Sequence, residues 1–204
     1  MPIALNPLPS SSSRVHTSVL ISHPDTPTQV VHEIEAHVRW HQERILSLSY
    51  TLSGDHAQFQ IPALRSPARA DDLWRHTCFE AFVALPGDPA YQEWNFSPSG
   101  EWALYHFRDY RKRLPLADNE PAPEIDVRQT PEGLTLEARL LLPYRLTAQP
   151  LLQFALSAVI EDAHGNLSYW ALTHPPGKPD FHRRDAFVLE IAPPHDAATR
   201  KEPS

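Results

Sequence analysis

The sequence predicts an all-β protein that folds as a two-layer antiparallel β-sandwich. Prolines account for 22 of the 204 residues, and each proline removes a backbone donor and clashes with the preceding helical turn, so long helices are excluded. The apolar runs between the prolines are short, and several alternate with polar residues in the two-residue period of a half-buried strand. Roughly ten such runs separated by turns are typical of a sandwich or a barrel.

The clearest strands are two alternating segments. In 46–52, apolar residues alternate with serines and a threonine, and in 134–142 leucines alternate with polar residues. Gly133, just before the second segment, indicates a hairpin that pairs this segment with 124–130. Further strands are expected at 79–85, 151–160, 167–172 and 186–191, with a short turn at 163–166 between two of them.

One apolar segment early in the chain fits both a helix and a strand. Val31, Ile34 and Val38 have helical spacing, whereas Ile34, Ala36, Val38 and Trp40 have strand spacing. Because Val and Ile favour a pleated surface, we predict a strand.

The length and the composition indicate a single folded domain. A β-sandwich often uses about 200 residues as one unit, and the hydrophobic content of 41% is enough for a core. Residues 1–14 are rich in Pro and Ser and are expected to form a mobile arm. Residues 193–204 are polar and are expected to form a flexible tail. The predicted sandwich domain therefore covers 15–192.

The charge of the chain argues against nucleic acid as a partner. The formal net charge is −7, and binding to a phosphate backbone requires several clustered cations. The densest basic stretch, 108–113, is interrupted by Asp109, and a solvated loop explains it as well as an anion site does. The expected partner is a small molecule.

Cysteine content and the N-terminal sequence bear on the compartment. Cys78 is the only cysteine, so an intrachain disulfide is excluded. The N-terminus lacks the charged and apolar regions of a secretory signal peptide, and no apolar run approaches the ~20 residues that cross a bilayer. We therefore expect the cytoplasm of a bacterium and no membrane association.

Tryptophans are concentrated in the segment 73–111, which contains Trp74, Trp94 and Trp102. In a β-sandwich binding module, exposed aromatic faces stack on a sugar ring or another planar ligand while nearby amides and charges orient it. The alternative is that a tryptophan fills the core, which is the more frequent environment of this residue. Trp74 and Trp170 are the stronger candidates for ligand binding, because each has polar or turn-forming neighbours.

Glu80 is a carboxylate on a strand that is apolar on both faces, so we expect it to be half-buried on an inner strand. An unpaired buried charge is costly, and Arg75, His76 or Asn95 could provide a partner. Two interpretations remain open, a ligand-hydroxyl acceptor and a structural ion pair.

No catalytic nucleophile is assigned. Cys78 lacks features that would lower its pKa or expose it, so a buried inert thiol is expected. Ser97 and Ser99 lack the glycine that precedes the serine in a nucleophile elbow, and their segment is predicted to be a turn.

The loop 173–183 is the second polar region, and it carries His174, Lys178, Asp180 and His182 among three prolines. Asp180 and His182 are two residues apart, so in an extended chain they point the same way and could ligate a metal together with His174. We favour a stiff loop that forms a wall of a ligand site, and we assign no metal site.

Several segments, taken together, carry a resemblance to a known family. They are Leu73-Trp74, Thr77-Cys78-Phe79-Glu80, Asn95-Phe96-Ser97-Pro98-Ser99-Gly100-Glu101-Trp102, Tyr110-Arg111, Tyr169-Trp170-Ala171-Leu172 and His174-Pro175-Pro176-Gly177-Lys178-Pro179-Asp180-Phe181-His182. With these segments the chain resembles the DOMON-like domain proteins of bacteria, a group that is similar to the family-nine carbohydrate-binding modules. The resemblance covers roughly residues 15–192.

The resemblance implies a β-sandwich related to modules that bind sugars or, in other DOMON branches, haem. In the sugar-binding relatives two tryptophans enclose the end of a saccharide, and Trp74 and Trp170 match them by strand context. The haem-binding relatives use axial Met and His ligands. Because Met1 is the only methionine, bis-His ligation is the alternative for this chain.

Three functional hypotheses follow. The first is a non-catalytic domain that binds a small ligand, with a saccharide as the leading candidate and no cofactor assigned. The second is a hydrolase in which Glu80 and Asp180 act as an acid–base pair, which requires a separation of about 5–10 Å. The third is a haem or metal protein. The ligand-binding residues predicted under the first hypothesis are Trp74, Glu80, Asn95, Trp102, Trp170, His174, Lys178, Asp180 and His182.

Overall fold

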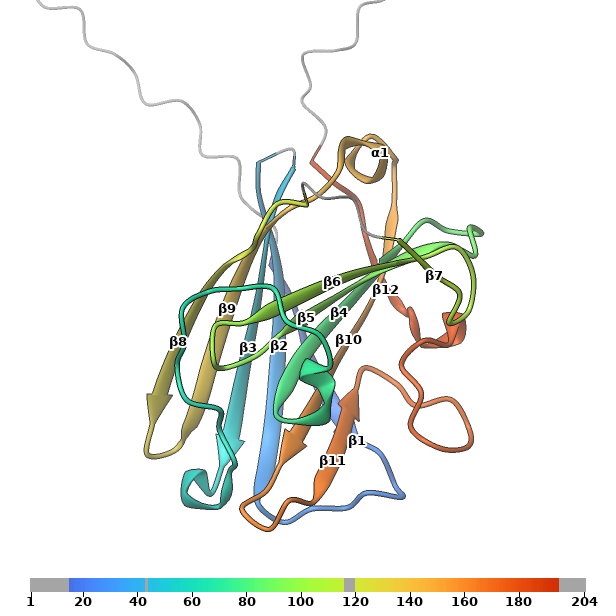
Figure 1. The fold of residues 1–204 in the computed structure, drawn as a ribbon. Coiled ribbons are helices and arrows are strands. Elements are labelled where there is room, and N and C mark those ends of the chain that lie inside the picture. Colours follow the sequence, from blue (N-terminus) through green and yellow to red (C-terminus); the bar gives the residue numbers. More distant parts are fainter. Residues whose placement is uncertain (1–14, 43, 116–119, 195–204) are drawn as a thin grey trace, which may run out of the picture.

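The computed structural model describes residues 15–42, 44–115 and 120–194, and within them it confirms the predicted all-β sandwich (Figure 1). The predicted arm 1–14 and residues 195–204 of the predicted tail lie outside the described residues. The strands are β1 (Val15–Ser22), β2 (Val31–Gln42), β3 (Ile45–Gly54), β4 (Cys78–Ala84), β5 (Tyr91–Phe96), β6 (Trp102–Phe107), β7 (Arg113–Leu114), β8 (Glu124–Thr130), β9 (Gly133–Leu141), β10 (Leu152–Glu161), β11 (Leu167–Ala171) and β12 (Leu189–Ile191).

Helical structure in the described residues is short. It comprises the α-helix α1 (Tyr144–Thr147) and the 3₁₀ segments η1 (His56–Gln58), η2 (Leu73–Arg75) and η3 (Arg184–Ala186). No described helix has the length and apolar character that crossing a membrane would require.

The strands form one curled sheet that folds into two layers (Figure 1). The first layer has the order β1-β2-β3-β9-β8, and the second has the order β7-β6-β5-β4-β10-β11, with β12 beside β10. Strand β1 connects the layers, because Val15 to Leu20 pair with β2 whereas Ile21 and Ser22 pair with β11.

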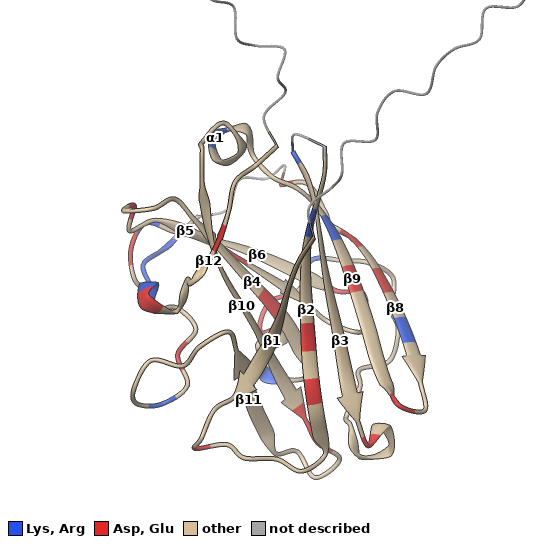
Figure 2. Ribbon diagram, turned by 180° about the vertical axis from the view of Figure 1, so that it is seen from behind, with Lys and Arg blue, Asp and Glu red and all other residues tan. Residues whose placement is uncertain are grey.

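The first layer shows the predicted alternation directly. Strand β3 pairs antiparallel with β9, so that Leu48 lies opposite Ala138 and Tyr50 lies opposite Leu136, and all four are buried. The opposite face of this layer is polar, and Figure 2 shows charged residues along β2, β8 and β9. The ambiguous segment is a strand, as predicted, and it forms β2.

The second layer has two buried faces. Phe79, Ala81 and Val83 of β4 belong to the main core together with Trp94 of β5. The alternate residues point to the outer face of the layer, because successive side chains of a strand lie on opposite faces. This outer face carries a smaller apolar cluster that is capped by Phe187 from the long segment before β12.

The predicted elements differ from the structure at several strands. The strand expected at 186–191 is shortened to β12, and η3 precedes it. No strand was predicted at β1, β7, β5 or β6. The turn predicted at 97–100 lies between β5 and β6. These two strands are buried along almost their whole length, so a one-sided alternation could not reveal them.

Candidate functional site

A pocket of about 540 Å³ lies on the outer face of the second layer, which is within the usual size range of small-molecule sites. Strands β4, β5, β6, β10 and β11 form its floor, and η2, the 108–113 segment and the 172–183 segment form its walls. The lining residues are Thr26, Asp72, Trp74, Glu80, Glu93, Tyr105, Phe107, Arg111, Arg113, Val159, Tyr169, Lys178, Pro179, Asp180, Phe181 and His182.

Two carboxyl groups lie side by side at the floor of the pocket. Glu80 is opposite Asn95 and Glu93 is opposite Phe82 in the β4–β5 pairing, so the two side chains are diagonal neighbours on the same face. Both are buried. Burial raises the pKa of Glu80 well above its usual value and raises the pKa of Glu93 to about 7, in each case because burial penalises the charged form.

The hydrogen bonds of Glu80 differ from those expected. Its Oε2 atom accepts a hydrogen bond from Ser157 Oγ of β10 at 3.3 Å. The three partners proposed from the sequence are engaged elsewhere, since Arg75 pairs with Asp72, His76 with Glu161, and Asn95 with Glu93. The structural ion pair proposed for Glu80 is therefore wrong within the described residues.

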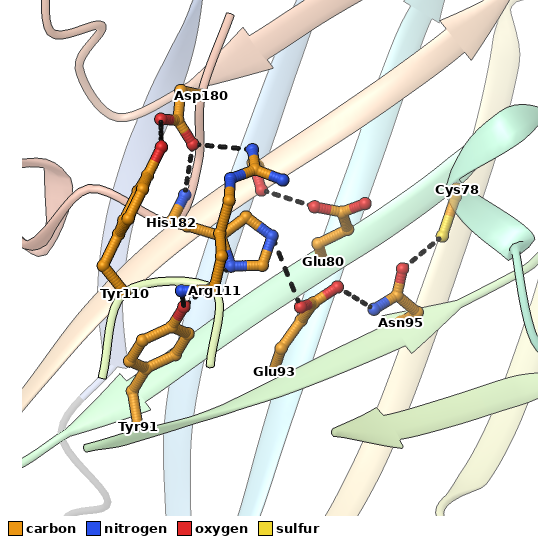
Figure 3. Close-up of polar contacts among 10 residues, drawn as sticks. Cys78, Glu80, Tyr91, Glu93, Asn95, Tyr110, Arg111, Asp180 and His182 are labelled. Carbon is orange, nitrogen blue, oxygen red and sulfur yellow. Dashed lines mark hydrogen bonds and ion pairs between the residues drawn. The ribbon is translucent and has the colours of Figure 1, made fainter. Parts of the chain in front are cut away.

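A polar chain extends from Glu93 in two directions (Figure 3). Asn95 Nδ2 donates to Glu93 Oε1 at 2.7 Å, and Cys78 Sγ donates to Asn95 Oδ1 at 3.6 Å. On the other side, His182 Nε2 lies 3.7 Å from Glu93 Oε2, and its Nδ1 is 2.8 Å from Tyr91 Oη. Burial lowers the pKa of His182 to about 4, so this imidazole is neutral at pH 7.

Asp180 connects two of the pocket walls (Figure 3). Its Oδ1 accepts a hydrogen bond from Arg111 Nη2 at 2.8 Å and another from the backbone N–H of His182 at 3.2 Å, while Oδ2 accepts one from Tyr110 Oη at 2.6 Å. Burial acts to raise the pKa of Asp180, but the bonds from Tyr110 and Arg111 outweigh it and lower the pKa. Asp180 is therefore an ionised clamp between the 172–183 and 108–113 segments.

Asp180→Asn is expected to loosen this clamp. The amide cannot accept the same charged hydrogen bonds, and bonds to charged groups contribute about 1.5–3 kcal/mol each when buried. The Arg111 side chain is half-exposed, so we expect a smaller loss, about 1 kcal/mol, in the free energy of unfolding. Hydrogen exchange should become faster in 172–183 and remain unchanged in β3. Unchanged exchange in both places would contradict the clamp.

Backbone strain occurs at two walls of the pocket. Asp72 and Arg111 are the non-glycine residues with positive φ in the described chain, at 62° and 52°, and both line the pocket. The Arg111 conformation is held partly by its N–H, which donates to Tyr91 Oη at 3.1 Å. Residues in such conformations cluster at functional sites.

The aromatic surface of the pocket comes from several elements. Trp74 of η2 is 42% exposed, and the guanidinium of Arg75 lies 5.4 Å from its ring centroid. Tyr105 of β6 lies beneath Arg113, whose guanidinium carbon is 3.7 Å from the ring centroid. The pocket therefore offers one accessible indole and other aromatic rings among charged groups.

The structure brings together five of the nine residues predicted to bind a ligand. Trp74, Glu80, Lys178, Asp180 and His182 all line the pocket.

The other four predicted residues do not line the pocket. Trp102 and Trp170 are buried in the main core, and Trp170 Nε1 donates to Ser168 Oγ at 3.0 Å. Asn95 is buried beside Glu80 and Glu93 on the same face of the sheet, and it donates a hydrogen bond to Glu93. His174 Nε2 is 2.8 Å from the carbonyl oxygen of Ile21, so it attaches the loop to β1. The expected pair of facing indoles, Trp74 and Trp170, is therefore not formed.

The site also contains four residues that the sequence did not indicate as ligand-binding: Glu93, Tyr105, Arg111 and Arg113. The sequence held a signal for Glu93. Glu93 and Asn95 are on either side of Trp94, so in a strand their side chains share the face opposite to the tryptophan. For Arg111 and Arg113 the basic stretch was noticed, but only folding shows that it turns back toward the loop of Asp180. Within the described ranges, no group of three or more His, Cys, Asp and Glu residues is arranged to hold a metal ion.

The fold is a β-sandwich, and two solved structures of the same fold show what this chain is similar to. The chain is similar to a protein of Bacteroides uniformis that is described as a candidate carbohydrate-binding protein, with 13% identity, a TM-score of 0.61, and 87% of this chain and 86% of that chain covered. It is also similar to a family-nine carbohydrate-binding module of Caldicellulosiruptor kristjanssonii in complex with cellotriose, with 14% identity, a TM-score of 0.55, and 93% and 89% covered.

At these identities the likeness shows a shared fold. No protein-family model matches the sequence, and no curated protein sequence matches it. The predicted similarity to family-nine modules is thus found in the fold, while membership of the DOMON-like group stays a prediction.

Proposed function

We propose that this protein binds a small polar ligand of saccharide size in the pocket on the outer face of the second layer. The observation that carries the proposal is the composition of this pocket, in which the exposed Trp74 ring and buried polar groups such as Glu80 and Glu93 line one cavity. An aromatic ring covers the apolar face of a sugar, while carboxyl groups and amides bond its hydroxyls.

Two further observations support a binding role. The pocket volume suits a mono- or disaccharide, and the family-nine module with the same fold is a saccharide binder, as its complex with cellotriose shows. In addition, the hydrogen bonds of Asp180 join two walls of the pocket through protein groups alone, so little ordering is required on binding. Preorganised sites bind more tightly for this reason.

Trp74→Ala is expected to weaken saccharide binding about tenfold, because it removes the accessible stacking surface. Isothermal titration of the full chain against glucose, cellobiose and xylose would measure this effect. The matched control is Tyr144→Ala, which removes another exposed ring, on α1 and outside the pocket. Equal affinities for the wild type and Trp74→Ala would remove Trp74 from the site, and no binding of any sugar would refute the proposal.

A hydrolase is the second candidate, and one observation favours it. Glu80 and Asp180 line the same pocket, and their pKa values are shifted in opposite directions, as an acid and a base require. Against it, the oxygens of Asp180 already accept three hydrogen bonds. Turnover of aryl glycosides that is lost in both Glu80→Gln and Asp180→Asn would establish the hydrolase.

A further inference from the structure

The two carboxyl groups at the pocket floor lack a positively charged partner. Glu80 and Glu93 are 3% and 5% exposed, and both line the pocket. Ser157 bonds Oε2 of Glu80 and Asn95 bonds Oε1 of Glu93, but these donors are neutral. Among the described residues, Glu80 Oε1 has no hydrogen-bond donor, and no Lys or Arg forms a salt bridge with either carboxyl group. The floor is therefore acidic and open to a donor from the ligand.

The two arginines that line the pocket, Arg111 and Arg113, are engaged with other carboxylates. The Arg111 guanidinium is held by Asp180 at 2.8 Å. Arg113 lies 3.4 Å from Asp71 and stacks on Tyr105. Their charge reaches the floor, where Arg111 acts to lower the pKa of both glutamates, but burial has the larger effect. Lys178 lies on the wall formed by the 172–183 loop.

The His, Tyr and Cys side chains around the two glutamates are neutral at pH 7. Burial lowers the pKa of His182 to about 4 and raises the pKa of Tyr91 to about 12. Burial also raises the pKa values of Cys78, Tyr50 and Tyr169. None of them supplies a positive charge.

An acidic floor with aromatic walls is the environment that suits a cation. A buried carboxylate is costly without a counter-charge, and a ligand cation would supply that charge. The exposed Trp74 ring lines the same pocket and would add attraction between the cation and its π face. A neutral sugar would satisfy the hydrogen bonds of the floor, but it would leave the carboxyl groups without a counter-charge.

We propose that the pocket prefers ligands that carry a protonated amine, such as amino sugars, with the ammonium group between Glu80 and Glu93. This inference rests on the proposed ligand-binding function and specifies the chemical class of the ligand. The ammonium group would donate to the free Oε1 of Glu80 and to Glu93, and the remainder of the ligand would lie against the aromatic wall.

Binding of a cation would release protons. In the free protein Glu93 titrates at about pH 7, and burial also raises the pKa of Glu80 well above its usual value. An ammonium group lowers the pKa values of both carboxyl groups, so the affinity should increase as the pH rises toward 7. Below pH 7 the affinity for the amine should rise by up to about tenfold per pH unit if binding releases one proton.

The test compares sugars that differ only in charge. We expect the full chain at pH 7 to bind glucosamine or 6-amino-6-deoxyglucose at least about tenfold more tightly than glucose. N-acetylglucosamine, which has the nitrogen without the charge, should show no gain. The affinity of 6-amino-6-deoxyglucose should rise between pH 5.5 and pH 7, whereas that of glucose should not.

Variants of the two glutamates test whether the pocket floor causes the preference for a protonated amine. Glu80→Gln and Glu93→Gln keep the shape of the side chain, and in each variant the ratio of the amino-sugar affinity to the glucose affinity should fall to about one. Glu33→Gln makes the same charge change at an exposed position of β2 and should retain the preference. Equal affinities of the wild type for glucose and both amino sugars would overturn this inference and leave the proposed function intact. Failure to bind any of these sugars would overturn the proposed function as well.

Discussion

Trp170→Ala is expected to lower the free energy of unfolding by about 3–5 kcal/mol, the usual cost of truncating a large buried aromatic side chain. Trp170 is 7% exposed and belongs to the main core between the layers. Its truncation would leave a cavity and remove the donor to Ser168 Oγ. Urea unfolding of the wild type and the variant would measure the difference.

Trp74→Ala provides the matched comparison, because it removes the same side chain from an exposed position. Its effect on stability should stay within about 0.5 kcal/mol, as is usual for a surface substitution. The two substitutions should therefore have different effects: Trp170→Ala should lower stability, and Trp74→Ala should weaken ligand binding. A stable Trp170→Ala variant that has lost only ligand binding would contradict the core position of this residue.

Glu93→Gln is expected to stabilise the protein at pH 8 by up to about 3 kcal/mol and to have little effect at pH 5. The folded-state pKa of about 7 lies above that of an unfolded glutamate. A carboxyl group with a raised pKa destabilises the fold as the pH rises from its unfolded pKa toward its folded pKa, because the unfolded state releases its proton first. Each unit of difference corresponds to about 1.36 kcal/mol, and glutamine removes this penalty.

His182 changes the free energy of unfolding with pH in the opposite direction to Glu93, so the two contributions must be measured separately. Its folded-state pKa of about 4 lies below the usual value of 6.5, so its neutral burial costs stability as the pH falls below 6.5. The wild type alone can therefore show a flat profile between pH 5 and pH 7. The informative quantity is the difference between Glu93→Gln and the wild type, measured by urea unfolding at several pH values. A difference that does not change with pH would show that Glu93 titrates normally.

The sequence was sufficient to predict most strands of the first layer. In β3 and β9, residues such as Leu48 and Leu136 alternate with polar residues, because one face of this layer meets the core and the other meets water. That pattern is local, so it can be recognised without knowing the partner strand. The second layer is different, because the alternation is absent where both faces of β5 and β6 are buried.

For the site, the sequence identified the segments but not the orientation of every side chain. Trp170 and Tyr169 are adjacent, so one faces the core and the other the pocket, and only the pairing of β11 with β10 decides which. The ion-pair interpretation of Glu80 failed for a related reason, whereas its interpretation as a ligand acceptor stays a prediction. Its hydrogen-bond donor Ser157 lies 77 residues further along the chain, and such a pairing cannot be read from neighbouring residues.

By itself, the sequence determined the all-β class, the amphipathic strands and the polar, proline-stiffened loop that contains Asp180. These features depend on the period of the side chains and on backbone restrictions that act over a few residues. Only the tertiary structure decided that Glu80 and Glu93 share one buried floor and that Arg111 closes one wall. The reason is physical, since the register between strands and the burial that shifts a pKa both depend on residues far apart in the chain.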